Sequence, residues 1–270
     1  MKKATHTEFE RFDDQGKLPS DNLKSTMAPP KRKAFINVDL GEGYGNFKCG
    51  PDEELIPMID HANIACGMLT TSQCRHGVKT GAHPGLPDVQ GFGRREMKLA
   101  PEEHTANIIY QVGALKAFLD AEGMELHHVK PHGILYGMMC RDPEVCKAVW
   151  AGVPKGIKVF GLAGTHMEKV ANEMGIEFVA EFYGDVKYTA EGALVIDRKK
   201  KPWKVEDVKK HVRQQVEDSA VTAVTGEVVH LPTKDYAVSL CCHSDSPGCV
   251  EIVTAARQVV DEYNKANGFA

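Results

Sequence analysis

The sequence lacks the features that mark membrane-spanning, secreted or nucleic-acid-binding proteins. No apolar run approaches the ~20 residues that cross a bilayer, and the polar start, MKKATHTEFERFDDQGK, has no apolar signal core. Charge is nearly balanced, because 33 Lys+Arg face 37 Asp+Glu in 270 residues. A broad basic surface for phosphates is therefore not expected. We expect a cytoplasmic chain with no membrane or nucleic-acid partner.

Several common site motifs are also missing. The eight cysteines include no CxxC pair, which argues against zinc ribbons and thioredoxin-type sites, so we expect mostly buried, reduced thiols. Cys241 and Cys242 precede His243, which leaves open a Cys–His nucleophile beside the buried-thiol interpretation. No GxSxG elbow occurs. DLGEGYG (39–45) is neither a Walker A nor a GxGxxG loop, and is either an anion-binding turn or a flexible acidic turn.

Short apolar runs alternate with helical segments from residue 34 onward. Seven runs rich in Val, Ile, Phe and Ala are typical of strands buried on both faces; they span 34–43, 61–67, 76–85, 126–133, 157–164, 176–185 and 236–245. Helices are predicted over 101–122, 143–150, 205–219 and 247–266. This alternation predicts a parallel sheet in an α/β fold.

Three other segments depart from the strand–helix rhythm. Residues 1–33 have no hydrophobic periodicity, and we expect a disordered or wrongly annotated leader, with Met27 as an alternative start. Residues 34–270 are expected to form one domain. The polar stretch 187–204 is expected to cross one end of the fold, and 226–234 to form a short hairpin arm.

Polar side chains collect where the predicted strands end. In a parallel α/β barrel these ends meet at one mouth, where active sites lie. Histidines and carboxylates gathered there serve as general acids and bases or bind a divalent metal. Each of three histidines is set in a Gly/Pro turn (GAHPG, KPHG, CHSDSPG). The strand-end residues are Asp39, Glu42, His61, Asn63, His83, Lys130, His132, Asp185, His243 and Asp245.

Two adjacent arginines lie in the GFGRRE segment (91–96). Arg94 and Arg95 either form a solvated face or recognise a carboxylate or phosphoryl group, since a guanidinium binds such groups through two parallel hydrogen bonds. The sequence alone supports both interpretations equally.

The motifs as a set resemble one protein family. NVDLGEGYGNFKCGPDEELIP, NIACG, GAHPGLPDVQGFGRREM, KPHGILYG and CHSDSPGCV are similar to LamB/YcsF sequences, which include the A-type component of 5-oxoprolinase and fungal lactam-utilisation proteins. The resemblance extends over about 36–260. It implies a distorted seven-stranded parallel (β/α) barrel of the glycoside hydrolase/deacetylase type. It also implies ATP-dependent opening of 5-oxoproline to glutamate together with B and C type subunits, which handle part of the ATP chemistry.

The resemblance matches Asp39, Asn63, His83, Lys130, His132, His243 and Asp245, and with the strand-end pattern it gives candidate roles for individual positions. The metal candidates are Asp39, His83 and His132. The expected catalytic residues are Asp39, His83, Lys130, His132, His243 and Asp245. The expected substrate-binding residues are Glu42, Asn63, Asp88, Arg94 and Arg95.

The match is interrupted after Gly67. Family members continue NIACG with FHAGDP and a helix, whereas this chain continues with MLTTSQC and is shorter there by about ten residues, nearly three helical turns. A histidine and an aspartate expected in the site are thereby absent. Val186 and Gly137 replace a family Arg and Asn.

Three hypotheses follow. The first is an ATP-dependent hydrolase of the 5-oxoprolinase type. The second is a metal-dependent deacetylase or amidohydrolase on the same barrel. The third is a catalytically impaired scaffold protein, which the shortened segment after Gly67 suggests. A misplaced exon boundary is an alternative explanation of that shortened segment.

Overall fold

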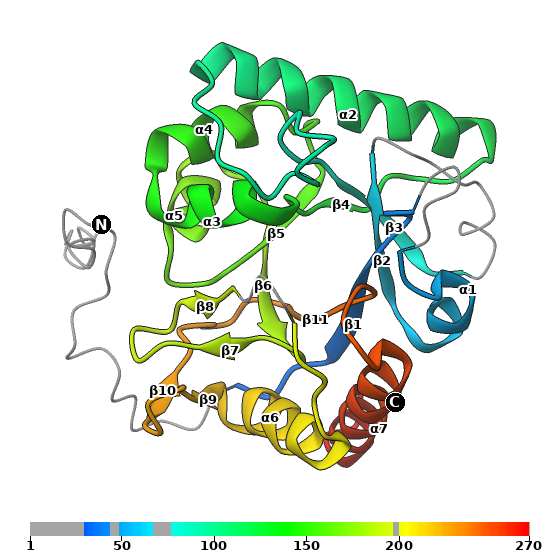
Figure 1. Ribbon diagram of the computed structural model, residues 1–270, viewed down its shortest axis with the longest axis vertical. Coiled ribbons are helices and arrows are strands. Elements are labelled where there is room, and N and C mark those ends of the chain that lie inside the picture. The colour runs from blue at the N-terminus through cyan, green and yellow to red at the C-terminus, as the bar shows by residue number, and fades with distance from the viewer. Residues whose placement is uncertain (1–29, 44–48, 67–76, 197–199, 270) are drawn as a thin grey trace, which may run out of the picture.

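Seven parallel strands form the centre of the protein and close into a barrel (Figure 1). The computed structural model describes residues 30–43, 49–66, 77–196 and 200–269. The strands follow the order β1, β2, β3, β4, β5, β6, β11, and β11 pairs back with β1. Their bounds are Ala34–Leu40 (β1), His61–Ala65 (β2), Lys79–His83 (β3), His128–Val129 (β4), Lys158–Gly161 (β5), Phe178–Tyr183 (β6) and Val238–His243 (β11). Each strand lies within one of the seven apolar runs, so the predicted α/β barrel is confirmed.

Helices surround the barrel, with α2 on one side and α6 and α7 on the opposite side (Figure 1). The four predicted helices are confirmed to within two residues; they are α2 (Pro101–Ala121), α4 (Pro143–Ala151), α6 (Val205–Asp218) and α7 (Cys249–Ala266). The sequence did not indicate α3 (Gly133–Arg141) or α5 (His166–Glu173), both of which are short. The turn α1 (Asp52–Leu55) continues into the 3-10 turn η2 (Ile56–Met58).

Helix α2 shows how the sequence sets these elements. Pro101 occupies its first turn, and the Ala100 amide donates a 2.7 Å hydrogen bond to the Glu103 carboxylate, which satisfies one group at the helix start. Gly123 ends the segment with a φ of +68°, which favours glycine. Its buried apolar side chains recur every three or four residues; they are Ile108, Val112, Leu115 and Leu119.

Two small hairpins extend from the barrel. The first, β7 (Lys187–Tyr188) with β8 (Leu194–Val195), begins the polar stretch that was expected to cross one end of the fold. The second pairs β9 (Ala220–Thr222) with β10 (Val228–His230). The expected hairpin arm, 226–234, supplies β10, but its partner β9 lies before that range. Residues of both hairpins line the cavity at the barrel mouth.

The barrel interior is polar, whereas its outer wall is apolar. Ile36, Val38 and Leu40 of β1 belong to the buried hydrophobic core. The interior carries buried hydrogen-bonded side chains, because Asn37 Nδ2 donates to Ser239 Oγ at 2.9 Å and Asn63 Nδ2 donates to Asn37 Oδ1 at 2.7 Å. Polar groups removed from water need such partners. The strands therefore direct apolar side chains outward against the helices and polar side chains into the barrel.

Two expectations fall outside the described residues. They concern most of the leader, since 1–29 are not described, and the shortened segment after Gly67, within 67–76. Among the helices of the described ranges, none has the length and apolar character needed to cross a membrane.

Candidate active site

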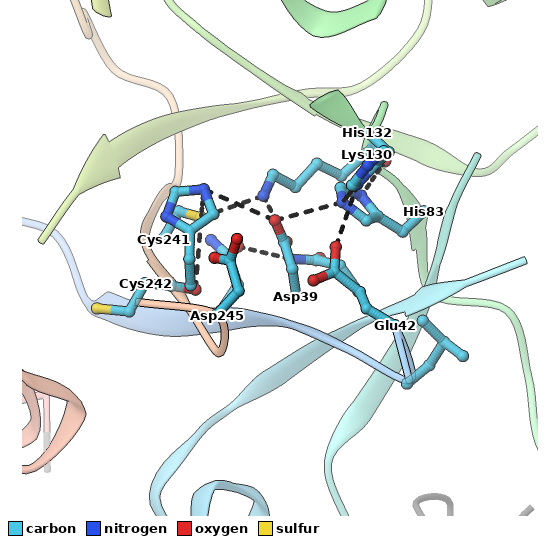
Figure 2. A network of polar contacts seen from close by, with 12 residues as sticks. Asp39, Glu42, His83, Lys130, His132, Cys241, Cys242 and Asp245 are labelled. Atoms are coloured by element: carbon cyan, nitrogen blue, oxygen red, sulfur yellow. Dashed lines mark hydrogen bonds and ion pairs between the residues drawn. The ribbon is translucent and has the colours of Figure 1, made fainter. Parts of the chain in front are cut away.

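Asp39, at the carboxyl end of β1, is the centre of the candidate site (Figure 2). Its Oδ1 accepts hydrogen bonds from Lys130 Nζ at 2.6 Å and Asn63 Nδ2 at 2.8 Å. Its Oδ2 lies 3.3 Å from His83 Nε2 and 3.7 Å from His243 Nε2. Burial raises the pKa of the Asp39 carboxyl, but His83 and Lys130 outweigh burial and hold this pKa well below its usual value. Asp39 is therefore a buried carboxylate anion.

Lys130, which follows β4, supplies the matching cation. It is 2% exposed, and besides Asp39 its Nζ contacts Cys241 Sγ at 3.1 Å and lies 3.8 Å from Glu181 Oε1. Burial lowers the pKa of Lys130, but Asp39 opposes this and the net pKa is raised well above its usual value. Burial raises the pKa of the Glu181 carboxyl, so the cation is shared chiefly with Asp39. Lys130 is therefore held as a cation at the floor of the site, beside the Asp39 anion.

Two thiols lie at the end of β11, and both are poor nucleophiles. Cys241 lies inside this cluster, whereas Cys242 pairs in register with Val38 and belongs to the hydrophobic core. Burial raises the pKa of Cys241 and Cys242 well above the usual value. The thiolate is the reactive form, so the geometry supports the buried-thiol interpretation. The cysteines of the described residues are all free.

Two histidines from neighbouring strand ends face each other beside Asp39. His83 Nδ1 donates to the Lys130 carbonyl at 2.7 Å, and His132 Nε2 donates to the Phe92 carbonyl at 2.8 Å. Their other nitrogens, His83 Nε2 and His132 Nδ1, are 3.0 Å apart. Glu42 Oε1 lies 3.2 Å from His132 Nδ1. Two imidazoles and a carboxylate thus converge on one point (Figure 2).

His243 is held in a different orientation by Asp185. His243 Nδ1 donates to Asp185 Oδ1 at 2.8 Å, and Asp185 Oδ2 also accepts bonds from the His243 amide at 3.3 Å and from the Ser246 hydroxyl. Burial raises the pKa of the Asp185 carboxyl, but His243 lowers it more, so it stays ionised. An imidazole anchored through Nδ1–H leaves Nε2 to accept a proton. That nitrogen points toward Asp39 and the barrel mouth.

The remaining expected site residues lie at the rim. Asp245 is paired with Arg94 at 2.7 Å and with Lys200, which lowers its pKa to about 2 despite burial. The Asp88 carboxylate accepts from the Arg95 guanidinium and from the Gly91 amide, and so stabilises its own loop. Arg94 therefore faces the site, whereas Asp88 and Arg95 are engaged with each other.

A cavity of about 1660 Å³ opens above these groups. Ordinary ligand pockets measure ~300–1,000 Å³, so this one has room for more than a small lactam. Gly137 and Val186, the two single-residue departures from the family pattern, line its wall. Its floor and lower wall are formed by Asp39, His83, Lys130, His132 and His243. Five of the six expected catalytic residues are thus brought together.

Two participants were missed as site residues at the sequence level. Glu181 is a lone carboxylate within the apolar run 176–185, and that isolation was the available signal. Asp185 was visible as a strand-end residue, but only the β6–β11 pairing reveals that it anchors His243.

Comparison with known proteins links this chain to one family and to lactam-utilisation and 5-oxoprolinase relatives. The LamB/YcsF family model matches residues 35–267. The lactam utilization protein lamB of Emericella nidulans is 67% identical over 253 residues, covering 90% of this chain and 100% of the relative. The A-type component of 5-oxoprolinase from Pyrococcus furiosus is 39% identical over 247 residues, covering 85% of this chain and 94% of the relative.

Solved structures agree with this assignment. The crystal structure of the lactam utilization protein from Thermus thermophilus superposes with a TM-score of 0.77 at 37% identity, over 86% of this chain and 97% of that one. A putative cellobiose-phosphate cleavage protein from Enterococcus faecalis, with a TM-score of 0.53 and 12% identity, shares the fold alone. The chain belongs to the LamB/YcsF family.

Proposed function

We propose that this chain is the lactam-binding component of a cytoplasmic, ATP-dependent 5-oxoprolinase, which opens 5-oxoproline to glutamate. A relative named as the A-type component of 5-oxoprolinase is 39% identical to the chain, which covers 94% of its length. That relative is named as one subunit of several, which indicates an assembly, and we propose B and C type subunits as partners. The sequence has no Walker A loop, and we assign most of the ATP binding to those partners.

The observation that carries the chemistry is the Asp185–His243 pair. Asp185 fixes the Nδ1–H of His243, so Nε2 is free to take a proton from a water molecule in the cavity. The activated water attacks the lactam carbon, in its free form or after ATP has phosphorylated the lactam oxygen. When the C–N bond opens, the ring nitrogen takes the proton held by His243 Nε2 and becomes the amine of glutamate. If the lactam oxygen was phosphorylated, the product of this step is an acyl phosphate, and a second water molecule hydrolyses it to the glutamate carboxylate and inorganic phosphate.

The other groups position the substrate and stabilise charge. Lys130 Nζ lies at the cavity floor, where it stabilises negative charge that develops on the lactam oxygen. Arg94 is 2.7 Å from Asp245, and its side chain is 42% exposed at the rim. We assign it to the carboxylate of 5-oxoproline, since a guanidinium binds carboxylates in a bidentate manner.

Reconstitution with B and C type subunits tests the proposal. The intact assembly should release glutamate and ADP only when 5-oxoproline and ATP are both present. His243→Asn should lower kcat by ~10²–10⁴-fold, the usual contribution of a general base. Lys116→Gln, on an exposed ion pair of α2, should leave the rate unchanged. Full activity in His243→Asn would refute the assignment of the base.

A second candidate is a metal-dependent amidohydrolase that needs no ATP. The cluster of Glu42, His83 and His132 favours it, because these ligand atoms lie within 4.8 Å of one another. Turnover of an amide by the isolated chain without ATP would support it. The scaffold hypothesis rests on 67–76, outside the described residues.

A further inference from the structure

Asp39, Glu42, His83 and His132 bring several hydrogen-bond acceptor atoms close together, and the number of protons available between them has to be worked out. The outer nitrogens of both histidines, His83 Nδ1 and His132 Nε2, are committed as donors to backbone carbonyls. In neutral rings the inner nitrogens, His83 Nε2 and His132 Nδ1, therefore carry lone pairs, and these two nitrogen atoms lie 3.0 Å apart. A carboxylate oxygen flanks each one, Asp39 Oδ2 at 3.3 Å from His83 and Glu42 Oε1 at 3.2 Å from His132.

One shared proton does not satisfy this arrangement. A proton on His132 Nδ1 is directed to Glu42 or His83, but it leaves no proton between His83 Nε2 and the Asp39 carboxylate. A proton on His83 Nε2 satisfies Asp39, but it leaves the His132 Nδ1 lone pair facing the Glu42 carboxylate. A proton on each inner nitrogen places two imidazolium N–H groups against each other at 3.0 Å. A cation that accepts several lone pairs at once resolves every contact. Buried acceptors of this kind otherwise cost free energy.

We propose that Glu42, His83 and His132 bind one divalent transition-metal ion. Ligand atoms held ~2.0–2.2 Å from a common zinc ion are about 3.0–3.5 Å apart along the edges of the coordination polyhedron. The measured contacts of 3.0 and 3.2 Å fall in this range. Two imidazoles with one carboxylate are a ligand set that Zn²⁺ takes at sites with an open coordination position. The sequence named Asp39 as a candidate ligand, and its Oδ2 lies 3.3 Å from His83 Nε2. Glu42, however, is the carboxylate whose oxygen lies within 4.8 Å of both histidine nitrogens, so we assign Glu42 as the third ligand.

The surroundings of the two histidines match a built metal site. A ligating histidine generally donates its other ring N–H to a carbonyl or carboxylate, which fixes the ring, and both histidines do so. The carbonyl facing His132 belongs to Phe92, whose φ of +57° is unfavourable for a non-glycine residue. Gly93 lies so close that a Cβ there would be 2.9 Å from His132 Cδ2. The ring has no room to turn away.

The ion would serve the proposed function by polarising the lactam oxygen or binding the attacking water, and to that extent the inference deepens the 5-oxoprolinase proposal. Its binding does not depend on that proposal, because it is measured on the full-length chain alone. Failure of metal binding and failure of 5-oxoproline turnover are therefore separate results.

The test is calorimetric titration of the EDTA-treated chain with ZnCl₂, with Co²⁺ absorption as a second readout. The wild-type chain should bind one equivalent and give the visible bands of a cobalt ion with nitrogen and oxygen ligands. Glu42→Gln and His132→Asn should each weaken binding by more than about 100-fold. Both should keep the wild-type circular dichroism spectrum, which separates loss of a ligand from loss of the fold.

His243→Asn is the matched control, because it removes a neighbouring histidine outside the proposed ligand set. It should retain one equivalent of Zn²⁺ with near wild-type affinity. Absence of binding in the wild type, unchanged binding in His132→Asn, or loss of binding in His243→Asn alone would each overturn the assignment. The last result would instead place the ion at Asp39, Cys241 and His243.

Discussion

Acidification should destabilise the barrel through the histidines buried in its interior, and His61 offers the cleanest test. It is 6% exposed, its Nδ1 lies 3.2 Å from Ser239 Oγ, and aromatic rings surround it, with Phe35 at 5.1 Å and Phe160 at 5.3 Å between centroids. Burial lowers the pKa of His61 to about 3. The unfolded chain regains a histidine pKa near ~6.5.

The sign and size of the effect follow from this difference. A group with a depressed native pKa binds fewer protons when folded, so its stabilising contribution is complete above ~pH 6.5 and is lost as pH falls. Each pKa unit corresponds to ~1.36 kcal/mol. Between pH 7 and pH 5, His61 alone should therefore lower the free energy of unfolding by about 2 kcal/mol.

The measurement is urea unfolding of the wild type and His61→Phe at pH 7 and pH 5. Phenylalanine fits among the same rings without titrating, and Ser239 Oγ keeps its bond from Asn37 Nδ2 at 2.9 Å. Titrating groups remote from His61 are common to both proteins and cancel. His127 and His128 are neighbours, with ring centroids 5.1 and 5.7 Å from that of His61, and their repulsion with His61 is part of the difference measured. The variant should lose about 2 kcal/mol less than the wild type over this interval. Parallel losses in the two proteins would refute the reasoning.

Two further substitution sets test the interior and the site. Gly81→Ala should be strongly destabilising, by more than ~2 kcal/mol, because its Cβ would lie 2.3 Å from the His128 ring. Gly113→Ala, in α2 with nothing within 4 Å of the added carbon, should stabilise by up to ~1 kcal/mol; equal thermal shifts in the two variants would contradict this account. Lys130→Met should cost ~3–5 kcal/mol by leaving the Asp39 carboxylate buried without its cation. Addition of Asp39→Asn should recover part of that loss in a double-mutant cycle, and strictly additive losses would show that the pair is not coupled.

The sequence predicted the strands and the longest helices because their apolar spacing is a local property. It also placed Asp39, His83, Lys130, His132 and His243 at the barrel mouth, and each of them lines the cavity. Gly/Pro turns after the strands were a sufficient signal for the three histidines.

Local sequence patterns do not predict which side chains of the site pair with each other. The sequence shows Asp185 and His243 at two strand ends, but their contact depends on β6 and β11 being neighbours. Asp88 carries the same charge as Asp39, yet the loop geometry directs it to Arg95 rather than to the cavity. Glu181 faces the barrel interior because the pairing of β6 with β11 in the closed barrel decides which alternate side chains of β6 point inward.

Closure between β1 and β11 has a consequence for how the protein is made. Asp39 pairs in register with His243, which lies 204 positions later in the chain. During synthesis, β1 can pair with β2 early, but its other neighbour, β11, leaves the ribosome only when nearly the whole polypeptide has been made. Contacts of such long sequence separation slow folding, and the open barrel exposes strand edges in the interval. The candidate site is therefore among the last parts of the protein to form, and a chain that stops before β11 has neither a closed wall nor His243.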